Sequence, residues 1–378
     1  MTEEHFSPKS GLVFFILFLI PFFLRFGGIP YIISFIICGI LGKFLFLKDE
    51  LVHLKIFEDL GLTLLFFFIG LEYSFEKLLR MKRIILPGLI DFSFNFIILF
   101  LILILFFGFA FRDSFLVSAV LYPTSTAVVT KLIIDTRSVA NPETDFLINL
   151  LIFEDLVIII FLSFFYSFTE GGELGLSSGL IFLKMILVFL FFYILSLIFN
   201  RFSFVLDRMS EEDIFIFLIF GAVILVSFGA KAIGFSEVVS SFLLGVVIPD
   251  TKVKHKIESS LSSIKDLSVG LFFFFFSYRI GLDVRVQVSH FEFFSLIFLA
   301  LILKFLSTYF GARVFGLSFY ASLRAGLSFL PRGEFSFVLI PLLGEKLATS
   351  VFNMVLVLIF SGIVSFIFAP RVLKIAKI

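Results

Sequence analysis

Two adjacent carboxylates, Glu154 and Asp155, lie inside the apolar run 150–160. An ionisable side chain inside a membrane span costs several kcal/mol, so it indicates a functional site by default. A carboxylate removed from water can bind either a proton or a small cation near neutral pH, and the two ligands then compete for one position. The alternative is a buried carboxylate satisfied by hydrogen bonds, which fits Glu154 better than Asp155. The pair therefore predicts a site at which a small cation is exchanged for a proton.

One lysine, Lys304, lies well inside another apolar stretch, residues 291–311. Because it is too deep to reach water easily, we expect it to pair with a carboxylate. Such a pair either has a structural role only or takes part in proton release when the cation binds. Two further charged residues within predicted spans have other expected roles. Glu237 is expected to be a packing or gating carboxylate, and Lys184 is expected to extend its ammonium group to the membrane surface.

Two apolar segments each contain a proline with polar neighbours near the middle. Pro123 is followed by Thr124, Ser125 and Thr126, and Pro331 is followed by Arg332, Gly333 and Glu334. Hydroxyl and backbone oxygens suit an alkali cation, while Arg332 and Glu334 can compensate the exposed ends of half-helices. Ordinary proline kinks are the alternative, but both positions also place hydroxyls or charges at membrane depth. We therefore predict two discontinuous helices that cross.

The composition indicates that these residues belong to a membrane protein. Hydrophobic residues make up 60% of the 378 residues and charged residues only 16%, whereas a soluble domain is about half apolar and a quarter charged. A membrane-spanning helix needs roughly 20 mainly apolar residues. Segments of this kind are predicted at 11–24, 29–47, 57–73, 84–108, 114–134, 145–168, 179–200, 213–230, 234–249, 264–280, 291–311, 321–344 and 349–369. They are too uniformly apolar for a β-barrel, so we expect an all-α membrane protein with about thirteen helices.

Three pairs of segments resemble each other at a nearly constant spacing along the chain. The paired phrases are Gly28–Ser34 and Gly234–Ser240 (with Gly39 and Gly245), Ile69–Glu72 and Ile280–Asp283, and the two proline breaks. Paired segments are seven spans apart, and an odd number inverts the second copy in the membrane. Inverted repeats are typical of secondary transporters, whose substrate binds near the midplane where helices break. We expect repeat one at about 11–168, a linker helix at 179–200 and repeat two at about 213–369.

Charge and cysteine content restrict the partners. Lys and Arg near the span ends collect mainly on the face that carries the C-terminus, which predicts a cytoplasmic C-terminus and an external N-terminus. The net charge of +1 gives no basis for nucleic-acid binding. One cysteine, Cys38, and four scattered histidines exclude cysteine-based and HExxH metal sites. We expect an alkali cation at Asp155, no transition metal and no cofactor.

Several phrases of the sequence resemble the monovalent cation:proton antiporter-2 family, which includes Kef-type potassium systems and NapA-like sodium/proton exchangers. They are residues 57–72, 234–239, 270–277 and 331–338, together with Ser125–Ala127 and the acidic pair. The resemblance covers nearly the whole chain. It implies an NhaA/NapA-like core domain with crossed broken helices, a dimerising panel, and an elevator-like alternation of access.

The resemblance also implies roles for individual residues. Asp155 would bind the cation and the proton, Lys304 would pair with the acidic site, and Thr124–Thr126 and Arg332–Glu334 would form the helix breaks. Position 154 is often Gln in Kef-type members and Asp in NapA-like ones, whereas this chain has Glu154. A second carboxylate together with an intact lysine favours electrogenic exchange. The chain ends at residue 378 directly after the last predicted span, so we expect no C-terminal nucleotide-binding regulatory domain.

The sequence thus predicts an antiporter, not an enzyme, that exchanges Na⁺ or K⁺ for protons across the inner or plasma membrane. The expected partners are the lipid bilayer and, by family resemblance, a second copy of the chain. Whether a separate regulatory subunit binds stays open. Two other functions stay open. One is an ion- or pH-sensing membrane module without flux. The other is a transporter of an organic anion on the same fold, against which the acidic pair argues.

Overall fold

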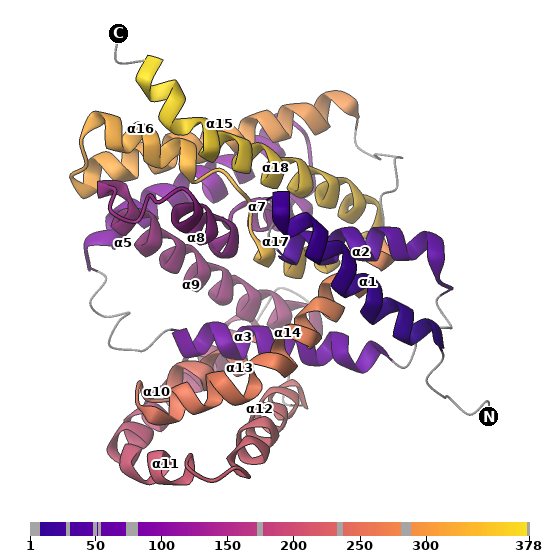
Figure 1. The fold of residues 1–378 in the computed structure, drawn as a ribbon. Coiled ribbons are helices and arrows are strands. Elements are labelled where there is room, and N and C mark those ends of the chain that lie inside the picture. Colours follow the sequence, from indigo (N-terminus) through magenta and orange to yellow (C-terminus); the bar gives the residue numbers. More distant parts are fainter. Residues whose placement is uncertain are drawn as a thin grey trace. The chain divides into compact units, whose positions relative to one another are not determined.

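The structure is a computed structural model that describes residues 8–27, 31–47, 51, 54–72, 82–171, 177–232, 237–280 and 289–375. Each of the thirteen predicted segments falls on a helix or on helices separated by a break (Figure 1). The all-α fold class is confirmed, while the number of membrane crossings stays a prediction. Among the described residues, 4 helices are long and apolar enough to span a membrane. The last part of α10, Leu190–Arg201, and α11 are bent by 74° and would make a fifth if the pair is one span.

The chain forms two compact units, one from residues 1–80 and 159–279 and the other from residues 81–158 and 280–378. The first unit contains α1 (Pro8–Leu24), α2 (Tyr31–Leu45), α3 (Lys55–Glu72), α10 (Ser177–Arg201), α11 (Ser203–Met209), α12 (Phe215–Ala232), α13 (Glu237–Val247) and α14 (Lys252–Ile280). Each unit takes helices from both predicted repeats.

The second unit contains the two broken helices. Its elements are α5 (Lys82–Phe92), the π-helix η4 (Ser93–Ile98), α6 (Leu99–Leu105), α7 (Phe111–Leu121), α8 (Thr126–Asp135), α15 (His290–Phe315), α16 (Phe319–Ser328), α17 (Glu334–Leu339), the 3-10 turn η5 (Ile340–Leu342) and α18 (Glu345–Ile375). The long helix α9 (Pro142–Gly171) starts in this unit and continues into the first.

Glycines bring helices of the first unit into backbone contact. A Cβ atom on Gly245 of α13 would lie 2.2 Å from the carbonyl oxygen of Phe67 on α3. One on Gly39 of α2 would lie 2.1 Å from the carbonyl oxygen of Phe274 on α14. Gly39 and Gly245 are the glycines that match in the predicted repeat, and α3 and α14 match as well. The contact between α2 and α14 is therefore the counterpart of the contact between α13 and α3, as two inverted repeats require.

We expect Gly245→Ala to lower the free energy of unfolding by about 1–3 kcal/mol, because the added methyl group forces two packed helices apart. Gly229→Ala on α12 is the matched control, since a Cβ atom there has nothing within 4 Å. Removing that helical glycine should stabilise the protein by up to about 1 kcal/mol. Thermal unfolding in detergent measures both effects. Equal midpoints for Gly245→Ala and the wild type would contradict the close contact of α3 and α13.

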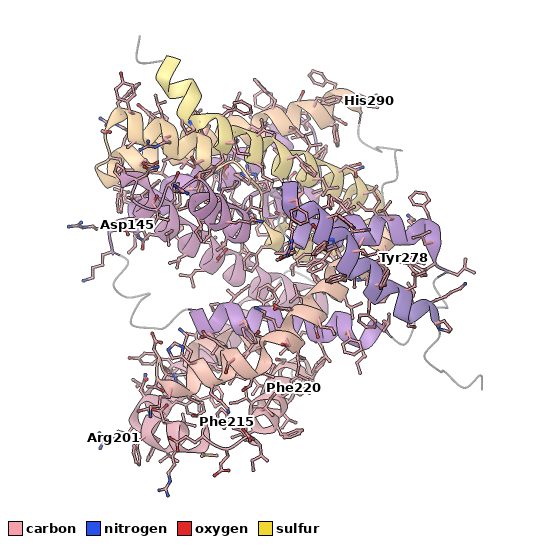
Figure 2. All side chains as sticks on the ribbon, in the orientation of Figure 1. Asp145, Arg201, Phe215, Phe220, Tyr278 and His290 are labelled. Carbon is pink, nitrogen blue, oxygen red and sulfur yellow. The ribbon has the colours of Figure 1, made fainter. Side chains whose placement is uncertain are left out.

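Aromatic side chains form much of the apolar surface, since 63 residues are phenylalanine. On α14, the rings of Phe274 and Tyr278 stack with their centroids 6.0 Å apart. The hydroxyl of Tyr278, which is labelled in Figure 2, donates a 2.8 Å hydrogen bond to the Phe46 carbonyl. On α12, by contrast, Phe217 and Leu225 are 76% and 75% exposed. Large outward apolar side chains of this kind suit contact with lipid.

Candidate functional site

The two predicted helix breaks meet in the second unit. The chain is extended between α7 and α8 and again between α16 and α17. The Ser125 N–H donates to the Pro331 carbonyl at 2.9 Å, and the Gly333 N–H donates to the Pro123 carbonyl at 3.0 Å. Thr124 lies opposite Arg332 in an antiparallel bridge. Two discontinuous helices therefore contact each other through the backbone at their breaks.

Small residues and local caps make this contact possible. A Cβ atom on Gly333 would lie 2.7 Å from the carbonyl oxygen of Thr124, so a larger residue would separate the two extended segments. The Ser125 hydroxyl accepts a 3.2 Å hydrogen bond from the Val128 N–H and so caps the start of α8. The Ser125 side chain is thus used to position the half-helix.

Lys304 of α15 is fully buried and lies between two carboxylates. Its Nζ donates to Glu154 Oε1 of α9 at 2.5 Å and to Asp91 Oδ2 of α5 at 3.2 Å. The third hydrogen bond goes to the carbonyl oxygen of Tyr122, just after α7, at 3.1 Å. The ammonium also lies 5.3 Å from the ring centroid of Tyr122 and 5.1 Å from that of Phe329, within the range of cation–π attraction. Lys304 therefore has the carboxylate partner that its burial predicts, and it has a second one as well.

Asp91 was not identified from the sequence, although it lies in the predicted span 84–108. It is fully buried. Its Oδ1 accepts from Ser307 Oγ at 2.6 Å and from Asn95 Nδ2 at 2.9 Å. Asn95 belongs to the π-helix η4, and Asn95 Nδ2 also lies 2.8 Å from Ser307 Oγ. The rule that singled out Glu154, a carboxylate within an apolar run, applies equally to Asp91 and could have found it.

The neighbouring carboxylates Glu154 and Asp155 have different partners. Glu154 Oε2 accepts a 2.6 Å hydrogen bond from the Thr124 N–H, in addition to the bond from Lys304. Asp155 Oδ2 accepts a 3.1 Å hydrogen bond from Thr126 Oγ1. This difference follows from helix geometry, because adjacent side chains point about 100° apart. Glu154 is thus bound to the lysine, whereas Asp155 lies beside a hydroxyl of the helix break.

Arg332 is buried and bonds mainly to backbone oxygens. Its Nη1 donates to the Tyr122 carbonyl at 3.1 Å, and its Nη2 donates to the Ala300 carbonyl at 2.8 Å. A weaker 3.5 Å contact joins Nη2 to Asn95 Oδ1. Two cations, Arg332 and Lys304, therefore share the carbonyl at the end of α7, where the helix dipole is negative. Arg332 holds the break in place and has no carboxylate partner among these bonds.

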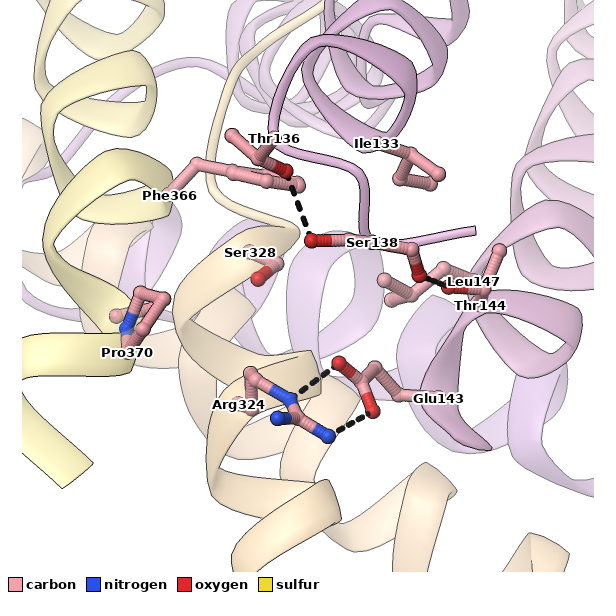
Figure 3. A pocket seen from close by; sticks show the side chains of 11 residues that line it. Ile133, Thr136, Ser138, Glu143, Thr144, Leu147, Arg324, Ser328, Phe366 and Pro370 are labelled. Atoms are coloured by element: carbon pink, nitrogen blue, oxygen red, sulfur yellow. Dashed lines mark hydrogen bonds and ion pairs between the residues drawn. The ribbon is translucent and has the colours of Figure 1, made fainter. Parts of the chain in front are cut away.

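A small pocket in the same unit is lined partly by the polar residues Thr136, Ser138, Glu143 and Arg324 (Figure 3). Glu143 at the start of α9 forms an ion pair with Arg324 of α16, in which Arg324 Nη2 donates to Glu143 Oε2 at 2.7 Å. The cavity volume of about 20 Å³ has room for a water molecule but not for an organic solute. This ion pair connects α9 to one of the broken helices.

The structure thus brings most of the predicted site residues together. The group contains Glu154, Asp155, Lys304, Thr124, Ser125, Thr126, Arg332 and Gly333. Glu334 starts α17 beside them, but its side chain lies outside the described part of the protein. Glu237 starts α13 in the other unit, where it is half-buried. Four further residues of the cluster, Asp91, Asn95, Tyr122 and Ser307, were missed.

A family model described as "Sodium/hydrogen exchanger, transmembrane" matches residues 13–376. The chain belongs to this family. It is therefore a multi-pass membrane protein of a transporter family and not an enzyme. This result confirms the resemblance that the sequence motifs indicated.

Individual relatives agree with the family match. The chain is 30% identical to the ammonium/H⁺ antiporter subunit AmhT of Alkalihalophilus pseudofirmus, covering 96% of this chain and 93% of the relative. It is 28% identical to the K⁺/H⁺ antiporter subunit KhtU of Bacillus subtilis, covering 79% and 74%. Among solved structures, the sodium proton antiporter MjNhaP1 of Methanocaldococcus jannaschii has the same fold, with a TM-score of 0.66, 16% identity and 96% coverage of both chains.

Proposed function

We propose that this exchanger is a secondary active antiporter that trades a monovalent cation for protons at Asp155 by alternating access. The observation that carries the proposal is the buried acidic pair at the crossing of two broken helices. Asp155 is 2% exposed and accepts a hydrogen bond from Thr126 Oγ1. A carboxylate so placed can carry either a proton or a cation, but not both at once.

The helix break supplies further oxygen atoms for the cation. Thr124 Oγ1 is buried and makes no hydrogen bond within the described residues, so it is free to act as a ligand. Alkali cations prefer hard oxygen ligands such as carboxylates and hydroxyls. We assign cation coordination to Asp155 and to the hydroxyls of Thr124 and Thr126. Glu154 is the second carboxylate, which the bound cation attracts away from Lys304.

The transported cation is proposed to be Na⁺, K⁺ or ammonium. The relatives include proteins named as ammonium, potassium and sodium antiporters. All three ions carry one positive charge and can replace a proton at a carboxylate. Two of these relatives are named as subunits, which supports the proposal of a regulatory partner. We also propose that the protein is a homodimer in the inner or plasma membrane, with a cytoplasmic C-terminus and an external N-terminus.

Proton flux in proteoliposomes tests this function directly. An acidic interior quenches a pH-sensitive dye, and Na⁺, K⁺, ammonium or choline is then added outside. Recovery of fluorescence with at least one of the first three ions, and none with choline, is the expected result. Protein-free vesicles are the control for ammonium, because ammonia crosses lipid unaided. A lack of response to all of these ions would contradict antiport and favour a sensing module without flux.

We expect Glu154→Gln to fold and to retain exchange, with the free energy of unfolding lowered by about 1–3 kcal/mol. The amide oxygen can still accept the hydrogen bond from the Thr124 N–H, and Lys304 keeps its bond to Asp91. Thermal unfolding and dye recovery, measured on the same preparation, test both parts of this expectation. Folded Glu154→Gln protein without any flux would contradict the division of roles between Glu154 and Asp155.

A further inference from the structure

Lys304 is held by two carboxylates that come from different helices. Glu154 belongs to α9 and lies next to Asp155, whereas Asp91 belongs to α5. The Nζ atom of Lys304 lies 2.5 Å from Glu154 Oε1 and 3.2 Å from Asp91 Oδ2, and all three side chains are fully buried. One lysine therefore has two counter-charges, and only one of them is adjacent to the carboxylate assigned to the cation.

Asp91 is fixed independently of the acidic pair. Its Oδ1 is occupied by Ser307 Oγ and Asn95 Nδ2, at 2.6 and 2.9 Å. Ser307 lies on α15, one turn from Lys304, so it moves with the lysine. Asn95 Nδ2 also donates to the Asp91 carbonyl at 3.0 Å, within a π-helix of the kind often found at functional sites. These bonds keep Asp91 Oδ2 directed at the ammonium group.

We propose that Asp91 is a positioning residue that keeps Lys304 charged through the whole transport cycle, so that one proton is exchanged for one cation and no net charge moves. This proposal rests on the proposed function and specifies its stoichiometry. It names a residue outside the acidic pair and the helix breaks, and it reverses the expectation of electrogenic exchange.

The charge balance depends on what happens to Lys304 when a cation arrives. If Glu154 turns to the cation, a lysine paired with Glu154 alone loses its counter-charge, and an uncompensated charge is strongly unfavourable in a buried site. That lysine would release its proton, so two protons would leave for each cation and one net charge would cross the membrane. With Asp91 present, Lys304 keeps the bonds to Asp91 Oδ2 and to the Tyr122 carbonyl. Only the proton on Asp155 then leaves.

Charge movement and proton flux, measured on the same proteoliposomes, test this inference. A pH-sensitive dye reports flux, and electrometry on a solid-supported membrane reports the charge displaced by a step in cation concentration. For the wild type we expect dye recovery without sustained charge displacement. In the wild type, charge displacement in proportion to the proton flux would overturn the inference and leave the proposed antiport intact. The absence of both signals would instead contradict the proposed function, and the inference with it.

Variants of Asp91 separate a positioning role from a purely structural one. In Asp91→Asn, Lys304 has Glu154 as its remaining acidic partner, so we expect exchange to become electrogenic, with one charge displaced for each cation. Asp91→Glu should keep exchange electroneutral. Asp145→Asn, an exposed carboxylate on α9, is the matched control and should also stay electroneutral. A ratio of charge to flux that is unchanged in active Asp91→Asn protein would contradict the role of Asp91. If Asp91→Asn does not fold, the ratio of charge to proton flux in the wild-type protein tests the inference by itself.

Discussion

Asp155→Asn is expected to reduce cation-driven proton flux to the level of protein-free vesicles while leaving the protein folded. The amide cannot take up a proton in place of a cation, and it lacks the charge that attracts the cation. The amide keeps the shape of the side chain and its carbonyl oxygen can accept the hydrogen bond from Thr126 Oγ1, now 3.1 Å long. The fold should therefore survive. Dye recovery in proteoliposomes measures the flux, and the thermal unfolding midpoint tests the fold.

Asp145→Asn provides the matched control for this prediction. Asp145 lies on the same helix, α9, but it is exposed and contacts Asn149 through an i,i+4 hydrogen bond. Its replacement removes the same charge from the same helix, so flux should stay at the wild-type level. Full flux in Asp155→Asn, or an equal loss in both variants, would contradict the assignment of the exchange to Asp155.

Lys304→Met should destabilise the protein strongly, by about 3–5 kcal/mol. Methionine has nearly the length of lysine, so little space is left empty. The change leaves Asp91 and Glu154 fully buried without their shared ammonium partner. The energetic cost is therefore that of two unpaired buried carboxylates. The midpoint of thermal unfolding in detergent measures it.

Removing the two carboxylates as well should restore much of the lost stability. The triple variant Lys304→Met, Asp91→Asn and Glu154→Gln removes the ammonium group together with both of its carboxylate partners. Neither carboxylate is then left buried without the lysine, so the unfolding midpoint should lie well above that of Lys304→Met. Lys265→Met is a control outside the cluster, since Lys265 forms a partly exposed ion pair with Asp266 at 3.2 Å. Such pairs contribute about 1 kcal/mol or less. A midpoint of Lys304→Met equal to that of Lys265→Met would contradict the buried network.

The sequence allowed the fold class and the helix breaks to be predicted because both depend on local patterns. Long apolar segments predict helices in a membrane. A proline next to hydroxyls or charges at equivalent places in two repeats predicts breaks that cross. The pairing of Gly39 with α14 and of Gly245 with α3 shows that matching glycines mark matching helix contacts.

The resemblance implied that Lys304 pairs with the acidic site, where Glu154 lies, but the second partner, Asp91, could not be identified from the sequence. Burial predicts that a carboxylate must be near, but it does not say which one, because α5, α9 and α15 are far apart in the chain. Asp91 precedes Lys304 by more than two hundred residues. The number of counter-charges, and with it the expected stoichiometry, depends on three-dimensional proximity. The expectation of electrogenic exchange rests on the acidic pair and the lysine alone and does not include Asp91.

The competition between proton and cation for Asp155 is the central claim, and the pH dependence of the cation KM tests it most directly. Initial rates of exchange are measured in proteoliposomes at a series of pH values, with the cation concentration varied at each. If one carboxylate binds either ligand, the KM should rise about tenfold for each unit of falling pH once the site is protonated, with the maximal rate unchanged. A constant KM with a falling maximal rate would show separate sites for the two ions and contradict the account.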